Sequence, residues 1–264
     1  MATREEVEAF HDPEYVEFVR RASERGTGYL DYGDTPAFKG VYEASMWVVG
    51  ATLTALEAVI SGRATRSFNP IGGLHHARRD RASGFCVFND VAIAIAIALE
   101  AHSVERVLYV DIDAHHGDGV FYGFYDDPRV WIFDVHEDGR YLYPGTGFRH
   151  ERGSGDALGT KLNYPLPPGA GDQELLKAME ELESFASEAS PDLIILQAGA
   201  DGLASDPLTH LLYSTKGYVA AVSKVRELAN ELCNGRLVAV GGGGYDRRAL
   251  AQAWIGLIEE LLRA

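Results

Sequence analysis

The stretch YVDIDAHHGDG (Tyr109–Gly119) places three aspartates and two adjacent histidines directly after the apolar run RVLYV. That run is rich in large and β-branched apolar residues, which predicts a buried strand. Burying unpaired charge is costly, so a fold that keeps it pairs it, hydrogen-bonds it or gives it a metal ion. Alternate side chains of a strand share a face, so Asp111, Asp113 and His115 are predicted to project together. Their chemistry suits a divalent metal such as zinc, although an acid cluster that caps the next helix would give the same pattern.

Apolar runs and helical stretches alternate along the whole chain. The predicted strands are 64–70, 106–112, 129–135, 191–199 and 236–242. The predicted helices are 4–24, 38–61, 89–102, 172–189, 215–233 and 246–263. This alternation predicts a single α/β domain over residues 1–264, with a mostly parallel sheet flanked by helices. The segment 143–169 is predicted to be a functional loop, because it is too long for an ordinary connection.

Composition excludes several classes of protein. The chain has 264 residues and a net charge of −15, which argues against direct nucleic-acid binding because that needs clustered Lys and Arg. By inspection, no apolar run reaches the roughly 18 residues of a membrane span, and the N-terminus lacks a signal core. A cytoplasmic protein is therefore expected. The two cysteines imply no disulfide framework, and Cys86 is predicted to be a small buried hydrophobe.

Reactive side chains follow three further predicted strands. His75 and His76 follow the first strand, Asp201 follows the strand 191–199, and Tyr245 follows the last one after four glycines. Ligands of open α/β sheets bind beyond the carboxyl ends of the strands, where all these groups would meet. The glycines lack the G-x-G-x-x-G pattern of a dinucleotide loop, so they are expected to let the backbone approach another ligand closely.

Five motifs in this order resemble the zinc-dependent histone deacetylase family, and more narrowly its prokaryotic, acetoin-utilization-type members. They are HHARRDRASGFCVFND (75–90), VDIDAHHGDGV (110–120), YPGTG (143–147), QAGADGLASDP (197–207) and GGGGYD (241–246). The resemblance implies an arginase/deacetylase-like fold. The family usually opens with a strand and a loop before the helix that matches residues 8–22. This chain begins at about that helix, so reduced activity is an expectation.

The resemblance also implies a set of bound metal ions. Its zinc ligands fall on Asp113, His115 and Asp201, a set that Fe²⁺ could also occupy. Potassium beside the zinc would use Asp111, Asp113, Asp134 and the carbonyls of His115 and Val135. A second, peripheral cation would use carbonyls near Phe124, Asp127 and Val130.

The catalytic roles implied by the family fall on five residues. His76 would be the general base that deprotonates the attacking water and later protonates the leaving amine. His75 would stay protonated. Asp111 and Asp118 would hydrogen-bond His75 and His76, respectively, and Tyr245 would donate its hydroxyl to the developing oxyanion.

Substrate contacts carried over from the family form a narrow acyl-lysine tunnel. Asp34 would hold the substrate backbone at the rim, and the Gly84 carbonyl would accept the amide N–H. Phe85 and Tyr143 would form the walls. The family usually has Phe at the second wall, so the hydroxyl of Tyr143 leaves the acyl preference open. Leu208 takes a position that is acidic in polyamine-selective members.

The remaining histidines are expected to lie outside the catalytic set or to support it. His116 is expected to be structural, and His136 to support the site or act in it. The others are expected to be loop or surface residues: His11, His102, His150 and His210.

The function expected from these residues is a zinc-dependent amidohydrolase that removes acetyl or other short acyl groups from lysine side chains of proteins or peptides. One alternative is a deacetylase of acetylpolyamines or other small acetylated amines. An alternative of another class is a catalytically weak protein that binds metal and acyl-lysine. The sequence leaves the oligomeric state open.

Overall fold

In the part of the chain that the structure describes, six strands form one parallel sheet in the order β1-β6-β5-β2-β3-β4. The computed structural model describes residues 1–100 and 104–263. Its strands are β1 (Arg66–Asn69), β2 (Val107–Asp111), β3 (Val130–Glu137), β4 (Lys161–Leu166), β5 (Leu193–Gln197) and β6 (Leu237–Val240). Five of them match the predicted strands to within a few residues, so the predicted parallel α/β sheet is confirmed.

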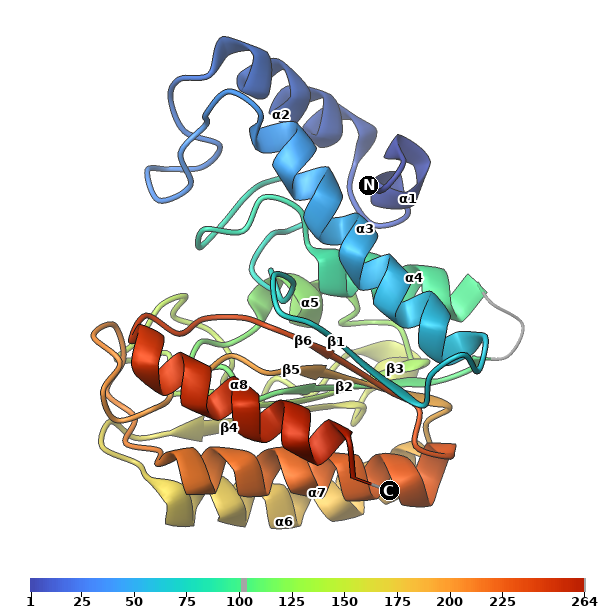
Figure 1. Cartoon of the computed structure of the whole chain (residues 1–264), viewed down its shortest axis with the longest axis vertical. Helices are drawn as coiled ribbons and strands as arrows, with labels where there is room; N and C mark the ends of the chain where they lie inside the picture. The colour runs from blue at the N-terminus through green and yellow to red at the C-terminus, as the bar shows by residue number, and fades with distance from the viewer. Residues whose placement is uncertain (101–103, 264) are drawn as a thin grey trace.

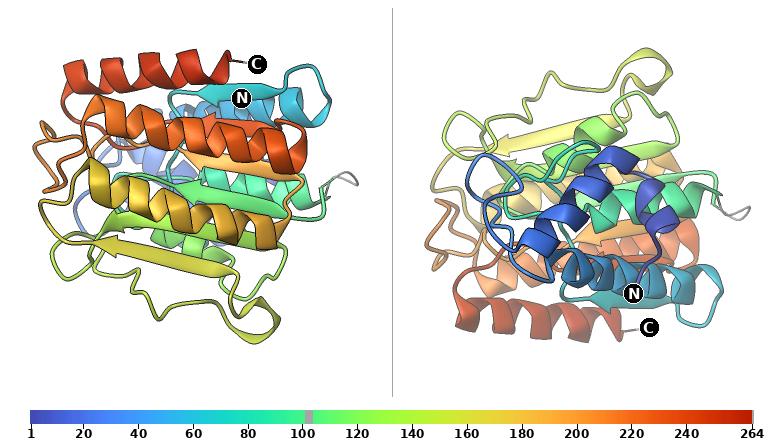
Figure 2. Two further views of the ribbon diagram at one scale, coloured as in Figure 1. Left: turned by 90° about the horizontal axis from the view of Figure 1, so that it is seen from below. Right: turned by 90° about the horizontal axis from the view of Figure 1, so that it is seen from above.

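Helices cover both faces of this sheet (Figure 1). They are α1 (Arg4–Glu8), α2 (Pro13–Arg25), α3 (Val41–Ile60), α4 (Asp90–Glu100), α5 (Asp118–Gly123), α6 (Asp172–Ala189), α7 (Thr215–Cys233) and α8 (Arg247–Leu261). Helices α6 and α7 lie against one face, and α1 to α4 lie over the other (Figure 2). Helix α8 packs beside the edge strand β1, where Trp254 meets the ring of Phe68.

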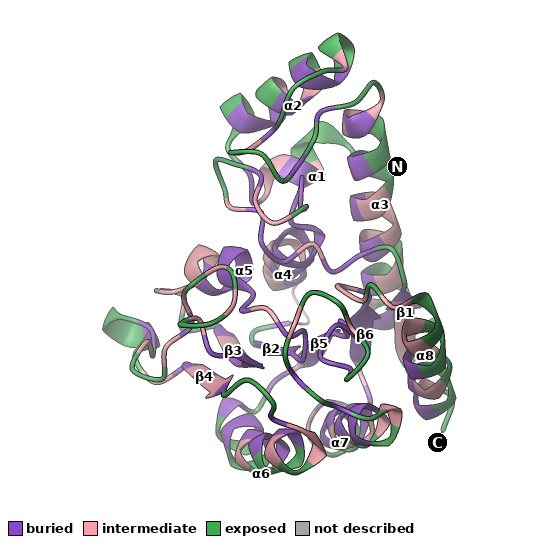
Figure 3. Ribbon diagram, turned by 90° about the vertical axis from the view of Figure 1, so that its left-hand side faces the viewer, coloured by how far each residue is buried: buried purple, intermediate pink, exposed green. Residues whose placement is uncertain are grey.

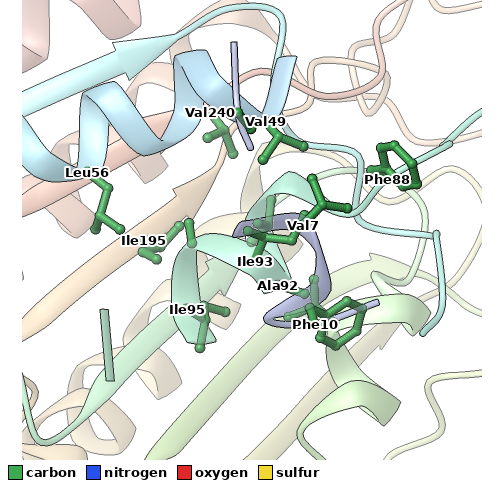
Figure 4. Packing of buried hydrophobic residues seen from close by; sticks show 14 of the residues in the cluster. Val7, Phe10, Val49, Leu56, Phe88, Ala92, Ile93, Ile95, Ile195 and Val240 are labelled. Atoms are coloured by element: carbon green, nitrogen blue, oxygen red, sulfur yellow. The ribbon is translucent and has the colours of Figure 1, made fainter. Parts of the chain in front are cut away.

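The alternation of side chains along the strands divides the interior into two cores. In β2, Val107 and Tyr109 join the core under α1 to α4, whereas Leu108 and Val110 join the core under α6 to α8. Figure 4 shows part of the first core, where side chains from α3 and α4 meet Ile195 of β5. Both faces of the strands are therefore apolar, as expected of a covered parallel sheet.

Helix α3 is the one described helix that is long and apolar enough to cross a membrane, by length and composition alone. It differs in this respect from the expectation that no such segment exists. One side of α3 buries Met46, Val49 and Leu56 against α4, β1 and α2 (Figure 3). A core helix of a folded domain passes the same test.

Two predicted elements are wrong in detail. The helix predicted over 4–24 is two helices, because Pro13 starts α2 at its first turn and Asp12 precedes it in an extended conformation. The segment 143–169 is not loop throughout. It contains a short 3₁₀ helix, Gly155–Ala157, and the edge strand β4, which pairs with β3. Helix α5 begins within the motif VDIDAHHGDGV (110–120), and the sequence did not predict a helix there.

His11 lies in the connection between α1 and α2, as expected of a loop residue, but its side chain is buried rather than at the surface. Its Nδ1 donates to the carbonyl of Arg79 at 3.2 Å, and its Nε2 accepts from the backbone N–H of Asn89 at 2.8 Å. Burial lowers its pKa to about 4, so the ring is neutral at pH 7. His150 is exposed, as expected. His102 and the end of the helix predicted over 89–102 lie outside the described residues.

Candidate active site

Three ligand atoms converge just beyond the carboxyl ends of β2 and β5. One ligand atom from each of Asp113, His115 and Asp201 lies within 4.8 Å of the others. His115 Nδ1 is 2.8 Å from Asp201 Oδ2, and the backbone N–H of Gly243 donates to Asp113 Oδ2 at 2.8 Å. A side chain at Gly243 would collide with the carboxylate of Asp201, which explains a glycine there. Two carboxylates and one imidazole are a donor set that suits zinc or Fe²⁺ and leaves coordination positions open.

Asp111 lies apart from this cluster, although strand alternation predicted that it would share a face with Asp113 and His115. The physical reason is that β2 ends at Asp111. The backbone N–H of Asp113 then turns back onto Asp111 Oδ1 at 3.0 Å, so the strand alternation does not continue. The carboxylate of Asp111 points to His75 instead.

The site as a whole is short of positive charge. Asp111 and Asp134 are buried, as are the two aspartates of the metal cluster. Burial alone lowers the pKa of His75 and His115, but the neighbouring carboxylates outweigh it and raise the pKa values to about 10 and about 11. The pKa of His136 is raised in the same way by Asp134. Imidazoles drawn toward protonation by surplus carboxylates mark a place where a bound cation fits.

The two adjacent histidines differ in protonation. His75 Nδ1 bonds Asp111 Oδ2 at 2.7 Å, and His76 Nδ1 bonds Asp118 Oδ1 at 2.8 Å. Their Nε2 atoms are 3.1 Å apart, so one must donate and the other must accept. Burial and the charge of His75 lower the pKa of His76 to about 4, whereas that of His75 is raised. His76 is therefore the ring with an unprotonated Nε2.

Arg78 belongs to the same network, although its role was not predicted from the sequence. Its guanidinium donates to Asp118 Oδ2 at 2.6 and 3.1 Å and lies over the ring of Tyr122. The pKa of Asp118 is lowered because its hydrogen bond and charge interaction with His76, and then those with Arg78, outweigh burial. The spacing of Arg78, two residues after His76, was the available signal. Arg78 therefore holds Asp118 ionised and oriented toward His76.

A cavity of about 330 Å³ opens from the metal cluster to the surface. Its lining includes every residue predicted to bind substrate, namely Asp34, Gly84, Phe85, Tyr143 and Leu208, together with the two histidines and Tyr245. Burial raises the pKa of Tyr245 above its ordinary value, so its hydroxyl stays protonated as a donor. The cavity thus brings the predicted metal, proton-transfer and substrate residues into one space.

The cavity wall that Phe85 forms has an unusual backbone conformation. Gly84 and Phe85 both have positive φ, at 52° and 69°. A side chain at Gly84 would come within 2.6 Å of the His76 ring, so only glycine fits against that histidine. Positive φ in an aromatic residue costs free energy and is a mark of functional sites. Phe85 is 56% exposed, and its ring forms a T-shaped pair with that of Tyr245, with centroids 6.3 Å apart.

The hydroxyl of Tyr143 is hydrogen-bonded to Ser83 Oγ at 2.5 Å. Ser83 lines a second recess rather than the main cavity, and Tyr143 lines both. The ring of Tyr143 meets that of His76 edge-on, with centroids 5.1 Å apart. The polar end of this wall is thus tied to Ser83, and the ring is the part that meets the metal site.

The rim of the cavity combines an acid with an apolar residue. The carboxylate of Asp34 makes no hydrogen bond to any of the described residues, so it is open to substrate N–H groups. Leu208 is 46% exposed. Its backbone N–H and that of Tyr245 are held by the two oxygens of Asp206, at 2.9 and 2.7 Å. Asp206, another residue whose role was not predicted, therefore sets the relative positions of Leu208 and Tyr245.

Buried polar residues support the site from behind. His116 bonds Thr146 at 2.8 Å, and His136 bonds Asp134 at 2.6 Å and the carbonyl of Gly147 at 2.9 Å. These contacts tie the loop that carries Tyr143 to β3 and to the metal motif. His210 is largely exposed and bonds Glu137.

The carbonyls expected to hold a peripheral cation have another partner. Those of Asp127 and Val130 accept hydrogen bonds from the ammonium group of Lys161, at 3.2 and 2.6 Å. The carbonyl of Phe124 accepts the backbone N–H of Asp127. The three carbonyls at which a second cation was expected thus accept hydrogen bonds from the chain itself.

A three-ligand metal cluster beside two carboxylate-bonded histidines is the arrangement of a metal-dependent hydrolase. The histone deacetylase domain matches residues 1–261, and the chain belongs to the histone deacetylase family. It is 45% identical over 263 residues to the acetoin utilization protein AcuC of Bacillus subtilis. The aligned region covers 96% of this chain and 68% of that protein.

Two solved structures share the fold. The HD domain of HDA15 has a TM-score of 0.90 and 30% identity, over 99% of this chain and 73% of that one. A histone deacetylase homolog from Aquifex aeolicus has a TM-score of 0.88 and 35% identity, over 100% of this chain and 72% of that one. Membership of this family supports the interpretation that the chain is a deacetylase that acts by hydrolysis.

Proposed function

We propose that this chain is a zinc-dependent deacylase that removes acetyl or other short acyl groups from lysine side chains of proteins or peptides. The observation that carries the proposal is a single cavity lined by three side chains that could hold a metal ion, by two histidines with opposite pKa shifts, and by a tyrosine whose pKa is raised. We further propose that residues 1–264 act as one catalytic domain and that the protein works in the cytoplasm.

Asp113, His115 and Asp201 would hold the metal ion, for which the excess of buried carboxylate is the supporting observation. Zinc or Fe²⁺ bound there would polarise the amide carbonyl and lower the pKa of water. A monovalent cation, potassium by the resemblance, would further offset the charge of Asp111 and Asp134, with the Val135 carbonyl as another ligand. Asp111 and Asp134 are neighbours in the pairing of β2 with β3, which supports this inner site.

His76 would accept the proton of the attacking water, because its Nε2 is unprotonated and its Nδ1 is held by Asp118. His75 would remain protonated and stabilise the developing negative charge. The same charge on the former carbonyl oxygen would be met by the hydroxyl of Tyr245. His76 would then return the proton to the leaving amine. This division of roles follows the opposite pKa shifts of the two rings.

Acyl-lysine fits the cavity better than a polyamine does. The Phe85 and Tyr143 rings would flank the apolar lysine stem, and the Gly84 carbonyl would accept its amide N–H. Asp34 would accept backbone N–H groups, which a peptide has and a polyamine lacks. Leu208 gives the second ammonium of a polyamine no charged partner at the rim. Since the hydroxyl of Tyr143 is bonded to Ser83, the wall behaves as an aromatic face toward short acyl groups.

The test is turnover by the zinc-loaded protein on an acetyl-lysine peptide and on acetylspermidine. We expect kcat/KM to favour the peptide, and Leu208→Glu to shift the ratio toward acetylspermidine by up to about fivefold, because one exposed ion pair at the rim contributes up to about 1 kcal/mol. Leu208→Gln, of matching size and no charge, is the control and should leave the ratio nearly unchanged. A wild-type preference for acetylspermidine would replace the lysine proposal with the small-amine alternative. No turnover of either substrate with zinc bound would favour a binding protein.

A further inference from the structure

Lys161, the first residue of the edge strand β4, is fully buried, whereas lysines usually lie at the protein surface. Its Nζ contacts three oxygens: the carbonyls of Val130 at 2.6 Å and Asp127 at 3.2 Å, and the hydroxyl of Thr160 at 2.6 Å. An ammonium group has three N–H donors, so each donor has one acceptor. The hydroxyl of Thr160 donates its own proton to the carbonyl of Ala157, which leaves its oxygen as an acceptor.

These oxygens form a pocket of the kind that binds a monovalent cation. The carbonyl of Asp127 comes from the connection between α5 and β3, and that of Val130 from the first residue of β3. The hydroxyl of Thr160 lies just before β4. None of the three groups carries a formal charge, so the charge at the centre comes from the lysine. A potassium ion and an ammonium group take oxygen neighbours at similar distances. The peripheral cation implied by the family resemblance would need the same carbonyls.

The ammonium carries its charge at neutral pH. Burial lowers the pKa of Lys161 to about 8, and the carboxylates of Asp127 and Asp126 oppose this effect. A second cation could reach the carbonyls only by expelling the ammonium, which would leave a charged group buried without partners.

We propose that Lys161 is a built-in cation, so that this chain binds no monovalent metal ion at the carbonyls of Asp127 and Val130. The ammonium joins β4 to the connection that follows α5, the helix that begins at Asp118. It therefore holds in place a segment that leads out of the active site. Any dependence of this protein on monovalent cations then arises elsewhere, and the peripheral site is insensitive to the salt around the protein.

The experiment is thermal unfolding of wild type and Lys161→Ala in potassium chloride and in tetramethylammonium chloride at equal ionic strength. In tetramethylammonium, we expect Lys161→Ala to melt roughly 5 °C or more below wild type, because buried carbonyls lose their partner. Potassium should recover at least half of that difference, since the small side chain opens a site for the ion. The wild-type response to potassium measures the contribution of other sites and is subtracted.

Two variants serve as controls. Lys161→Met fills the same space without charge, so it should be destabilised and should gain no more from potassium than wild type does. Lys177→Ala removes an exposed lysine of α6 and should leave the melting temperature and the salt response unchanged. The proposal is overturned if Lys161→Ala melts with wild type, or if potassium stabilises both proteins equally.

Diffraction from wild-type crystals soaked in thallium(I), a heavy analogue of potassium, decides the matter if Lys161→Ala does not fold. We expect no anomalous peak between the carbonyls of Asp127 and Val130, with the ammonium in place. A thallium peak there, with the Lys161 side chain displaced, would show that the site belongs to a metal ion. Neither measurement depends on whether the enzyme turns over.

Discussion

Two buried regions of this protein gather oxygen atoms, and they meet the need for positive charge in opposite ways. Around Asp113 and Asp201 the oxygens are charged carboxylates, and the nearby imidazoles only partly offset them. Around Lys161 the oxygens are neutral carbonyls and a hydroxyl, and one ammonium satisfies them. On the function proposed above, the first region would take an ion from solution, whereas the second contains its own cation. In the proposed enzyme, the positive charge that takes part in catalysis would come from a metal ion, and the one that joins β4 to its neighbours comes from a side chain.

The largest effect is expected when the metal cluster loses a ligand. Asp201→Asn keeps the shape of the side chain and removes one charge, so metal affinity and turnover should both collapse, with turnover at background. Chelation of the wild type should do the same, and added zinc should restore activity. Zinc should also stabilise the fold, by about 4 kcal/mol at a free concentration of 1,000 Kd. Metal content, turnover and melting temperature are the measurements. Full activity in metal-free protein would contradict the proposal that the region around Asp113 and Asp201 takes its positive charge from a metal ion.

The two histidines offer the next test. His76→Ala should lower kcat by roughly 10²–10⁴, the range of general acid–base catalysis, because it removes the group that moves the proton. His75→Ala should be less damaging, because His75 contributes charge and no proton transfer. Zinc content should stay close to wild type in both, and both should melt below wild type, because each change leaves a buried carboxylate, Asp111 or Asp118, without its histidine partner. If His75→Ala is the more damaging change across the pH range, the two roles are exchanged.

A smaller loss is expected at Tyr245. Tyr245→Phe removes the hydroxyl donor and almost no volume, and it should lower kcat by about 10²–10³, which corresponds to about 2.7–4 kcal/mol. The backbone N–H of residue 245 remains bonded to Asp206, so the rim should keep its geometry. Unchanged KM and zinc content would locate the loss in the chemical step. Turnover near that of wild type would exclude Tyr245 from the mechanism.

The smallest effect concerns His11, a buried group whose partners are both neutral. Its pKa in the folded protein, about 4, is below the ordinary value of 6.5, so the unfolded chain takes up the proton first. Its contribution to stability is therefore complete above pH 6.5 and is lost as the pH falls toward 4, by up to about 3 kcal/mol. Denaturant unfolding of wild type and His11→Gln between pH 7 and pH 4 measures it. The wild type should lose more stability, and parallel curves would contradict the prediction.

The strands and most helices were predictable because an apolar run bounded by turn residues carries its own signal. The active site was predictable because five motifs resemble a known family, and the structure brings their side chains into one cavity. Lys161 could not be predicted, because its partners are backbone carbonyls about thirty residues earlier, which leave no trace in side-chain chemistry. The burial of His11 was missed for the same reason, since it bonds only main-chain groups. The strand β4 was missed because its short apolar pattern lies after a glycine-rich loop and includes Pro165.

The strand order has a consequence for how this protein is made. Within the described part of the chain, strand β1, which leads to His75 and His76, pairs with β6 alone, and β6 is the last of the described strands. During synthesis from the N-terminus, residues near 70 must therefore wait for residues near 240 before their hydrogen bonds can form. Pairing over such sequence separations is slow and leaves apolar surface open in the meantime. The nascent chain would thus carry both histidines through most of translation without an active site, and hydrolytic chemistry would begin only after the whole sheet has closed.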